Sequence, residues 1–429
     1  MASYFKSPRA RKWLEELLAH ADIRLDGDRP FDIRVHDERL FDRVIAAGTL
    51  GAGEAYMQGW WDCGALDRLF TRAISAGLEN RLRLNLYTLA LTLRHTLFNM
   101  QSSGRAPMVA RRHYDFGNEL FEAMLGPNMN YSCAWWSGLE DVKTSKASLR
   151  ATEQARGRSR TDSEASAPGA GTDALPACYP QQPGARLEEA QNAKMELICR
   201  KLQLEPGMTV LDIGCGWGSL ARYMARNYGC QVTGISISHN QIEWARRREL
   251  EPDGAAGAGR ITWILGDYRD LRGEFDRIVS VGMFEHVGSK NYRRYFRTAR
   301  GLLKPHGLFL LHTIGALSLR AGCDPWISRY IFPNGQLPTL DAIIKACEGL
   351  FVLEDCHNLG ADYDPTLMAW HERFEQGLRA SAFDLTDAEA RMFRYYLLTC
   401  AAAFRCRDIE LWQIVLSPGG VAGGYEAVR

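Results

Sequence analysis

A loop of alternate glycines between an apolar run and a helical pattern is the feature that most restricts how this chain can fold. The run Thr209–Ile213 is followed by Gly214, Gly216 and Gly218, and an amphipathic pattern begins directly afterwards. This order predicts a strand, a tight turn and a helix N-terminus. Glycine suits such a turn because it adopts unusual dihedral angles and lets a ligand approach the backbone closely. The sequence therefore predicts a cofactor site at the end of a strand.

The spacing of these glycines favours S-adenosylmethionine (SAM) over a dinucleotide. A dinucleotide fingerprint has its third glycine where this chain has Ser219, and an acid about 20 residues later holds the ribose. Here Asp212 precedes the glycines, and the second predicted strand, 231–237, ends without an acid. A dinucleotide-dependent oxidoreductase remains an alternative, because glycine loops recur on many folds.

Helical and strand patterns alternate around the loop. The sequence predicts helices at 187–203, 218–228, 238–250 and 290–303, and strands at 208–213, 231–237, 260–265, 274–281 and 307–313. Two more helices follow, and after them a further strand-like run at 411–416. Repeated βα units with short connections predict an α/β fold with a doubly wound, mostly parallel sheet. The ligand should then lie at the carboxyl ends of the strands.

The remaining chain predicts a second domain and a linker. Residues 1–135 should form a smaller, mainly helical domain, with an amphipathic helix at 8–22 and an apolar helix at about 80–100. The apolar helix has two interpretations, a core helix or a lipid-contacting surface. Residues 136–186 include a run rich in Gly, Ala, Ser and Pro, which predicts a linker with a low-complexity insertion. Residues 187–429 would form the SAM-binding catalytic domain.

Composition argues against several functional classes. A formal net charge of +1 gives no overall attraction to nucleic acid. The 11 cysteines form no C-x-x-C pair and show no metal-ligand spacing. Together with the absence of a signal-peptide pattern, they predict free thiols in a reducing cytoplasm. No stretch reaches the roughly 18 to 20 apolar residues of a membrane span.

A series of short motifs occurs in order along the chain. They are HYDFGN at 113–118, NYSCAWW at 130–136, VGMFEHVG at 281–288, LHTIG at 311–315, YIFPNG at 330–335, GADYD at 360–364, FRCR at 404–407 and LWQ at 411–413. In this order they resemble the bacterial cyclopropane-fatty-acyl-phospholipid synthases, relatives of the mycolic acid cyclopropane synthases. The resemblance runs from about residue 10 to 416, apart from the region 141–186.

The resemblance implies a SAM-dependent methyltransferase that adds a methylene group to a cis double bond of an unsaturated phospholipid acyl chain. An alkene is a poor nucleophile, so the donor methyl must be held in line with it. Methyl transfer leaves a carbocation, which loses a proton as the ring closes. The resemblance also implies a bound bicarbonate ion as the base and a homodimer. It further implies a cytoplasmic enzyme in transient contact with the inner face of the cytoplasmic membrane.

Carried over by motif, the implied bicarbonate ligands are Cys133, Glu285, His312, the backbone of Ile314, and Tyr363. Glu285 and His312 also lie just beyond two predicted strand ends, where a ligand is expected. Glu285 would accept a proton from the anion, and His312 would donate to it. Judged by residue type alone, Glu285 would be a capping residue and His312 a structural histidine.

The resemblance implies a further set of functional positions. Around the cofactor, Tyr131, Ser132, Asp212, Gly214, Gly216 and Gly218 would contact the methionine end, Ser236, Ile237 and Gln241 the ribose side, and Asp267 and Tyr268 the adenine. Some accounts of the family assign catalysis to the cysteine at the position of Cys400. A thiol nucleophile has no place in a carbocation route, so packing is the alternative role for this residue.

Two rival functions share most of these motifs. One is a SAM-dependent enzyme that methylates the same alkene without closing a ring. The other is a non-catalytic lipid-binding or regulatory protein built on the cofactor fold. An intact set of bicarbonate ligands favours ring closure over the first, and the intact Glu285 and glycine loop argue against the second.

Overall fold

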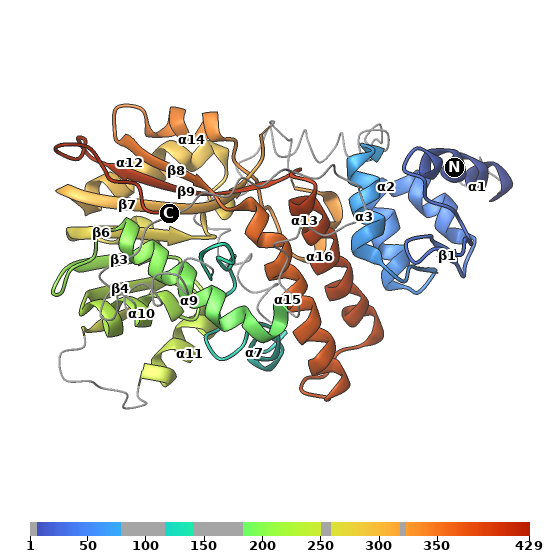
Figure 1. The fold of residues 1–429 in the computed structure, drawn as a ribbon, viewed down its shortest axis with the longest axis horizontal. Helices are drawn as coiled ribbons and strands as arrows, with labels where there is room; N and C mark the ends of the chain where they lie inside the picture. The colour runs from blue at the N-terminus through green and yellow to red at the C-terminus, as the bar shows by residue number, and fades with distance from the viewer. Residues whose placement is uncertain (1–6, 79–115, 140–182, 250–258, 318–322) are drawn as a thin grey trace, which may run out of the picture.

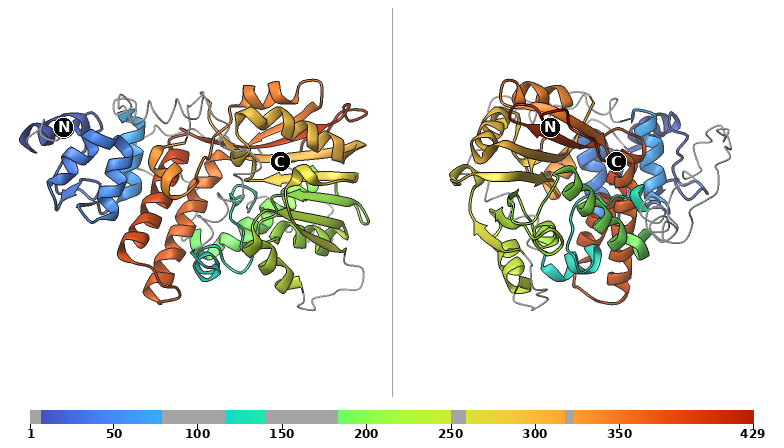
Figure 2. Two further views of the ribbon diagram at one scale, coloured as in Figure 1. Left: turned by 180° about the vertical axis from the view of Figure 1, so that it is seen from behind. Right: turned by 60° about the vertical axis from the view of Figure 1, so that its left-hand side comes forward.

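The computed structural model describes residues 7–78, 116–139, 183–249, 259–317 and 323–429. The predicted helix at about 80–100 and most of the predicted linker lie outside these residues. Figure 1 shows a sheet with helices on both faces at one end of the molecule and a group of N-terminal helices at the other. Two long helices stand between them, and Figure 2 shows the same arrangement from behind.

The main sheet has seven strands in the order β5-β4-β3-β6-β7-β9-β8. Their bounds are β3 (Thr209–Ile213), β4 (Gln231–Ser236), β5 (Ile261–Leu265), β6 (Phe275–Val281), β7 (Leu303–Gly315), β8 (Val352–Asn358) and β9 (Glu410–Ser417). The strands from β3 to β7 pair in parallel, and β9 lies antiparallel between β7 and β8. The predicted α/β fold with a mostly parallel sheet is therefore confirmed, whereas β8 was not predicted.

Alternating side chains of the strands bury both faces of this sheet. In β7, Leu308 and Leu310 pack into one apolar cluster, and Phe309 and Leu311 pack into another. The first cluster includes side chains of α9 (Pro183–Lys201), α10 (Ser219–Tyr228) and α11 (His239–Glu249); the second includes side chains of α12 (Tyr292–Leu302) and α14 (Leu340–Cys347). Helix α9 begins at Pro183, inside the predicted linker.

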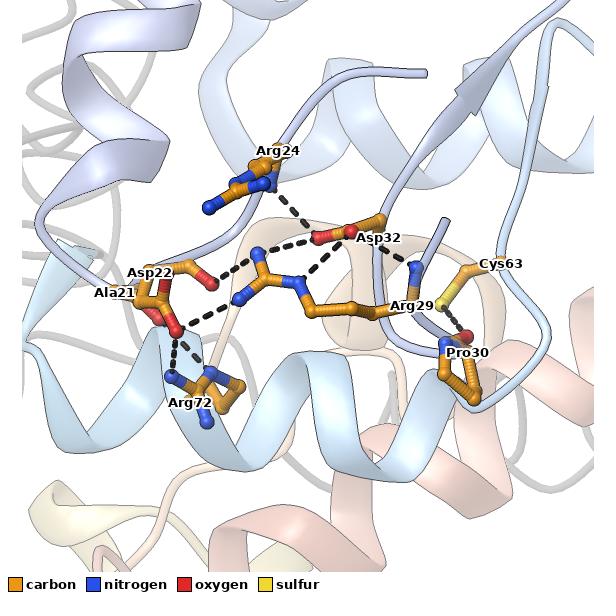
Figure 3. A network of polar contacts seen from close by, with 8 residues as sticks. All are labelled: Ala21, Asp22, Arg24, Arg29, Pro30, Asp32, Cys63 and Arg72. Atoms are coloured by element: carbon orange, nitrogen blue, oxygen red, sulfur yellow. Dashed lines mark hydrogen bonds and ion pairs between the residues drawn. The ribbon is translucent and has the colours of Figure 1, made fainter. Parts of the chain in front are cut away.

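The N-terminal helices α1 (Ser7–Ala19), α2 (Arg39–Met57) and α3 (Leu66–Ser75) pack with a short antiparallel pair, β1 (Arg34–Val35) and β2 (Trp61–Asp62). A network of charged side chains fixes the loop between α1 and β1 (Figure 3). The buried Asp32 carboxylate accepts hydrogen bonds from the backbone N–H groups of Arg24 and Arg29 and from the Arg29 guanidinium. Arg29 and Arg72 both bind Asp22. These contacts tie the loop to α3.

A third apolar cluster joins the N-terminal helices to the sheet end of the molecule. It extends from Ala10 to Leu411 and includes α7 (Asn118–Leu125), α13 (Pro325–Tyr330) and the two long helices α15 (Gly360–Arg379) and α16 (Asp387–Arg405). Residues on both sides of position 135 belong to this cluster, and the domain boundary there stays a prediction. Among the described helices, none is both long and apolar enough to cross a membrane.

Candidate functional site

A cavity of about 220 Å³ lies at the carboxyl ends of the parallel strands. Its walls come from the loops after β3, β4, β5 and β6, from residues 129–132, and from Ile331 and Phe332 directly after α13. This is the edge at which doubly wound sheets bind their ligands. The position of the cavity therefore agrees with the site predicted from the glycine loop.

Most residues predicted to contact the cofactor line this cavity. They are Tyr131, Ser132, Asp212, Gly214, Gly216, Ser236, Ile237, Gln241, Asp267 and Tyr268. Gly218 is not part of the lining and instead caps the N-terminus of α10. The contacts of these residues with a cofactor stay a prediction, but the fold does bring four separate chain segments to one cavity.

The glycine loop has a backbone that only glycine adopts easily. Gly214 has a φ of 83°, and a Cβ atom added there would lie 2.8 Å from the Met283 side chain. Gly218 has a φ of 81°, and a Cβ atom there would lie 2.2 Å from the Trp263 ring. Both positions combine a left-handed backbone with a close neighbour. The glycines are therefore required for the loop to close over the end of the sheet.

Polar groups at the end of β4 and β5 are bonded to one another. The Ser236 hydroxyl donates to the Gln241 side-chain oxygen at 3.0 Å, and the Ser238 backbone N–H donates to Ser236. Beyond β5, the Asp267 carboxylate accepts hydrogen bonds from the backbone and guanidinium of Arg269. Hydrogen bonds with Arg269 lower the pKa of Asp267 against the effect of its burial. Asp267 is therefore a fixed carboxylate at the cavity wall.

A buried lysine in the cavity wall was not predicted from the sequence. Lys194, in α9, is only 1% exposed and donates to the Ser132 hydroxyl at 2.8 Å and to the Asn130 side-chain oxygen at 3.2 Å. Burial lowers its pKa to about 8. In the sequence it resembles an ordinary helical lysine. Its burial is visible only in the structure, where α9 packs against the NYSCAWW segment.

Glu285 lies in η2 (Phe284–His286), the short turn that follows β6. Its Oε1 atom accepts a hydrogen bond of 2.6 Å from the backbone N–H of Ile314, and its buried Oε2 atom has no partner among the described residues. Burial raises the pKa of this carboxyl to about 7. Glu285 therefore gains and loses a proton near neutral pH, as a general acid or base requires.

His312 is buried near the end of β7, beside Gln413 of β9. The Gln413 side-chain nitrogen lies 3.3 Å from Nδ1 of His312. Because an amide nitrogen only donates, Nδ1 is the acceptor and the imidazole proton lies on Nε2. Burial keeps the pKa of His312 well below its usual range, so the ring is neutral. Its Nε2 atom has no partner among the described residues and is a free hydrogen-bond donor.

Cys133, in the 130–137 segment, and Tyr363, in α15, lie close together. The Cys133 thiol donates to the Ala134 carbonyl at 3.1 Å, and the Tyr363 ring stacks on Phe404 at 4.4 Å between centroids. Burial raises the pKa of both groups well above their usual values, and the nearby Glu285 carboxylate further raises that of Tyr363. Both side chains are therefore neutral, and Tyr363 lies near Glu285.

Cys400 lies in α16 close to Tyr363 and packs against the apolar cluster. Burial raises the pKa of its thiol far above neutral, which favours packing over nucleophilic catalysis. None of the predicted catalytic residues lines the cavity itself. Within the described ranges, no group of three or more His, Cys, Asp or Glu side chains is arranged to hold a metal ion.

Two residues of α15 fix the 130–137 segment against this helix. The Asp362 carboxylate accepts hydrogen bonds from the backbone N–H groups of Trp136 and Ser137. The Thr366 hydroxyl oxygen accepts from the backbone of Ala134 and from the Trp136 indole at 2.9 Å. Asp362 belongs to the GADYD motif, so the sequence signal for this contact was present. These bonds determine where Cys133 and the cavity wall lie.

Comparisons with known proteins agree with this geometry. Residues 101–161 and 175–414, more than half of the chain, match the family model for mycolic acid cyclopropane synthetase. Cyclopropane-fatty-acyl-phospholipid synthase of Escherichia coli (strain K12) is 46% identical over 414 residues, which cover 96% of this chain and 94% of that protein. Tuberculostearic acid methyltransferase UfaA1 of Mycobacterium tuberculosis is 32% identical, with 95% of this chain and 90% of that protein covered.

A solved structure extends the likeness to the three-dimensional fold. Mycolic acid cyclopropane synthase CmaA1, crystallised with SAH and CTAB, superposes with a TM-score of 0.55 at 26% identity, covering 72% of this chain and 97% of that one. SAH is the product that SAM leaves after methyl transfer. The fold is thus that of the class I SAM-dependent methyltransferases, and the chain belongs to the mycolic acid cyclopropane synthetase family.

Proposed function

We propose that this protein is a cyclopropane-fatty-acyl-phospholipid synthase. It would transfer a methylene group from SAM to a cis double bond in the acyl chain of an unsaturated phospholipid. The observation that carries the proposal is the 46% identity to the Escherichia coli synthase over nearly the full length of both proteins. The buried Glu285, titrating near neutrality beside the cofactor cavity, supports it independently.

The cavity residues fit SAM as the methyl donor. When bound, SAM would supply an electrophilic methyl group. The glycine loop leaves room for close approach to its backbone, and a buried Asp212 oxygen has no partner among the described residues. Asp212 and the segment 130–132 would hold the methionine end, and Ser236 and Gln241 would meet the ribose side. Fixing the donor in this way supplies the alignment that a weak alkene nucleophile requires.

The apolar part of the cavity lining suits an acyl chain. Val287, Ile331 and Phe332 give it an apolar wall. The Phe332 ring contacts His286 and Tyr396 at 6.0 and 5.7 Å between centroids. Aromatic faces attract positive charge, so these rings would stabilise the carbocation that methyl transfer leaves on the chain. The ring of His286 stays neutral because burial lowers its pKa to about 4, and it therefore adds no opposing charge.

Ring closure needs a base, and the orphaned atoms beside the cavity fit a bicarbonate ion. Glu285 and His312 each bury an atom without a described partner, one an acceptor and the other a donor. Bicarbonate offers both acceptors and a hydroxyl donor. The ion would supply the base when bound, held by Cys133, Glu285, His312, Ile314 and Tyr363. Glu285 would take up a proton from the ion, and Gln413, outside this set, would keep the His312 donor on Nε2.

The domains and the cellular location of the enzyme are also part of the proposed function. Residues 1–135 would dock on the bilayer and mediate formation of a homodimer, 136–186 would be a linker with a low-complexity insertion, and 187–429 would carry catalysis. The enzyme would work in the cytoplasm, in transient contact with the inner face of the cytoplasmic membrane. Support for the membrane role comes from the phospholipid named for the Escherichia coli relative.

One assay tests the reaction and the substrate class together. The purified protein is incubated with SAM and liposomes of a monounsaturated phospholipid, and fatty-acid methyl esters are analysed by gas chromatography–mass spectrometry. A ring product one methylene heavier than the substrate is expected, and liposomes of a saturated phospholipid should give none. A methyl-branched or methylidene product would instead assign the activity named for the UfaA1 relative. No product, despite bound SAM, would leave the non-catalytic alternative.

A further inference from the structure

A buried carboxylate of the N-terminal helices contacts the helix that precedes the apolar wall of the cavity. Glu54, in α2, is 5% exposed, and its Oε1 atom accepts a hydrogen bond of 3.0 Å from the Tyr330 hydroxyl at the end of α13. The guanidinium groups of Arg43 and Arg329 form ion pairs with the same carboxylate. Glu54 and Tyr330 are 276 positions apart in the sequence, so the tertiary fold creates this contact.

The two helices approach each other more closely than most side chains would allow. A Cβ atom added to Gly53 would lie 2.4 Å from the Trp326 ring, which is fully buried in α13. Burial of a carboxylate is unfavourable unless charged and hydrogen-bonding partners compensate it. Two of the three partners of Glu54, Tyr330 and Arg329, belong to α13. The carboxylate therefore anchors α13 to α2.

The end of α13 determines where one wall of the cavity lies. Ile331 and Phe332 follow Tyr330 directly, and both line the cavity. Their backbone N–H groups donate to the Ile327 carbonyl at 3.0 and 2.9 Å. Both residues are therefore fixed to the last turn of α13, and a shift of this helix would move them with it.

The segment that follows α13 also reaches Glu285. The backbone N–H of Gln336 donates to the Glu285 carbonyl at 2.9 Å. The Gln336 side-chain oxygen accepts a hydrogen bond of 3.0 Å from the Ser289 backbone N–H, three residues after η2. The segment 330–336 is thus held at one end by Glu54 and at the other by the turn that carries Glu285.

We propose that Glu54 is a positioning residue for the ring-forming reaction. Through Tyr330 it holds the Phe332 wall in place, and this wall keeps the carbocation of the acyl chain aligned with the groups that remove its proton. The N-terminal helices then shape the active site itself, in addition to their proposed role at the membrane. This inference rests on the proposed function.

The carbocation has two ways to lose a proton, and their ratio reports its alignment. Removal of a proton from the transferred methyl closes the ring, because the C–H electron pair forms the new C–C bond. Removal from a neighbouring chain carbon forms a C=C bond instead and leaves a methyl-branched alkene. The base takes up the proton in both cases. A loss of folded protein lowers both products equally, whereas a displaced wall changes their ratio.

A double-mutant cycle on monounsaturated liposomes tests the proposal. Turnover and products of the wild type, Glu54→Gln, Tyr330→Phe and the double variant are measured by gas chromatography–mass spectrometry. Each single variant should lower kcat by about tenfold or more and raise the fraction of methyl-branched alkene, since a misplacement of about 1 Å can cost about 10²-fold in rate. The double variant should lose no more than the more damaging single variant, because Glu54 acts through Tyr330.

The matched control is Asp32→Asn. Asp32 is 4% exposed, as buried as Glu54, and it lies in the network between α1 and β1 (Figure 3), away from the cavity lining. Asp32→Asn should keep the product ratio of the wild type even where it unfolds more easily. It therefore separates a general loss of stability in the N-terminal helices from a displaced cavity wall.

Tyr330→Phe keeps the inference testable if Glu54→Gln does not fold, because it removes a single hydroxyl. An unchanged product ratio in Tyr330→Phe would overturn the inference, whatever its kcat, and leave the proposed function intact. Additive losses of kcat in the double variant would also overturn it, since the two residues would then act independently. A wild type that makes no ring product would instead refute the proposed function, and with it the inference.

Discussion

Replacement of Glu285 by glutamine should change stability in a pH-dependent way. Burial raises the pKa of this carboxyl from 4.5 to about 7, which corresponds to about 3 kcal/mol between its two protonation states. The folded state therefore binds more protons than the unfolded state between these values. The contribution of Glu285 to stability is therefore greatest below pH 4.5 and falls as the pH rises through this window, since ionisation of the buried group is unfavourable.

Glu285→Gln removes the titrating group and keeps an oxygen that can accept from the Ile314 backbone N–H. Urea unfolding of the ligand-free wild type and variant is measured at pH 5 and pH 8. Relative to the wild type, the free energy of unfolding of the variant should rise by about 2 to 3 kcal/mol between pH 5 and pH 8, whatever the difference at pH 5. A stability difference that is the same at both pH values would refute the buried, high-pKa carboxyl on which the mechanism depends.

The same variant should lose activity while it keeps its cofactor. Turnover on monounsaturated liposomes should fall by about 10²-fold or more, the scale of removing a positioned base. Binding of S-adenosylhomocysteine should stay near that of the wild type, because Glu285 does not line the cavity. Unchanged turnover would remove Glu285 from the reaction, and lost binding would show that the substitution disturbs the cavity itself.

Two further substitutions test the site's framework. Gly218→Ala should lower the free energy of unfolding by at least about 1 kcal/mol and weaken S-adenosylhomocysteine binding, because its Cβ atom would meet Trp263 at a left-handed φ. Thermal unfolding measures the loss of stability. The control is Gly216→Ala, whose Cβ atom has no neighbour within 4 Å. Thr366→Val should cost about 1 to 3 kcal/mol and weaken cofactor binding, because the Trp136 indole loses its buried acceptor. Unaltered unfolding would show that water replaces the hydroxyl.

The parallel half of the sheet was predictable from sequence, whereas in the antiparallel half β9 was predicted and β8 was not. In β3 to β7, buried apolar runs alternate with amphipathic helices at short spacing, and this local pattern determines the βα order. Strand β8 has the sequence VLEDCHN, in which polar residues outnumber apolar ones. It lies at the edge of the sheet, where burial on both faces is not needed. Its pairing with β9 depends on long-range contact that no local window contains.

The candidate site was likewise predictable only in part. The glycine loop and the residues at strand ends follow from the pattern of strands, because chain direction alone brings these positions to one edge. Lys194 could not be identified, since a lysine in a helix is normally solvated. Its burial arises only because Asn130 and Ser132, distant in sequence, pack against α9. The role of Gln413 likewise depends on the register of β9 against β7, which places this residue beside His312.

The order of strands also has a consequence for how the protein is made. Strand β9 is the last strand of the sheet in the chain, yet it occupies an interior position between β7 and β8. During synthesis, β7 therefore leaves the ribosome with an edge that stays unpaired until residues 410–417 have been made. Unpaired edges promote association between nascent chains. The strand that closes this edge also delivers Gln413 to His312, so the growing chain acquires the partner of that histidine only as its sheet becomes complete.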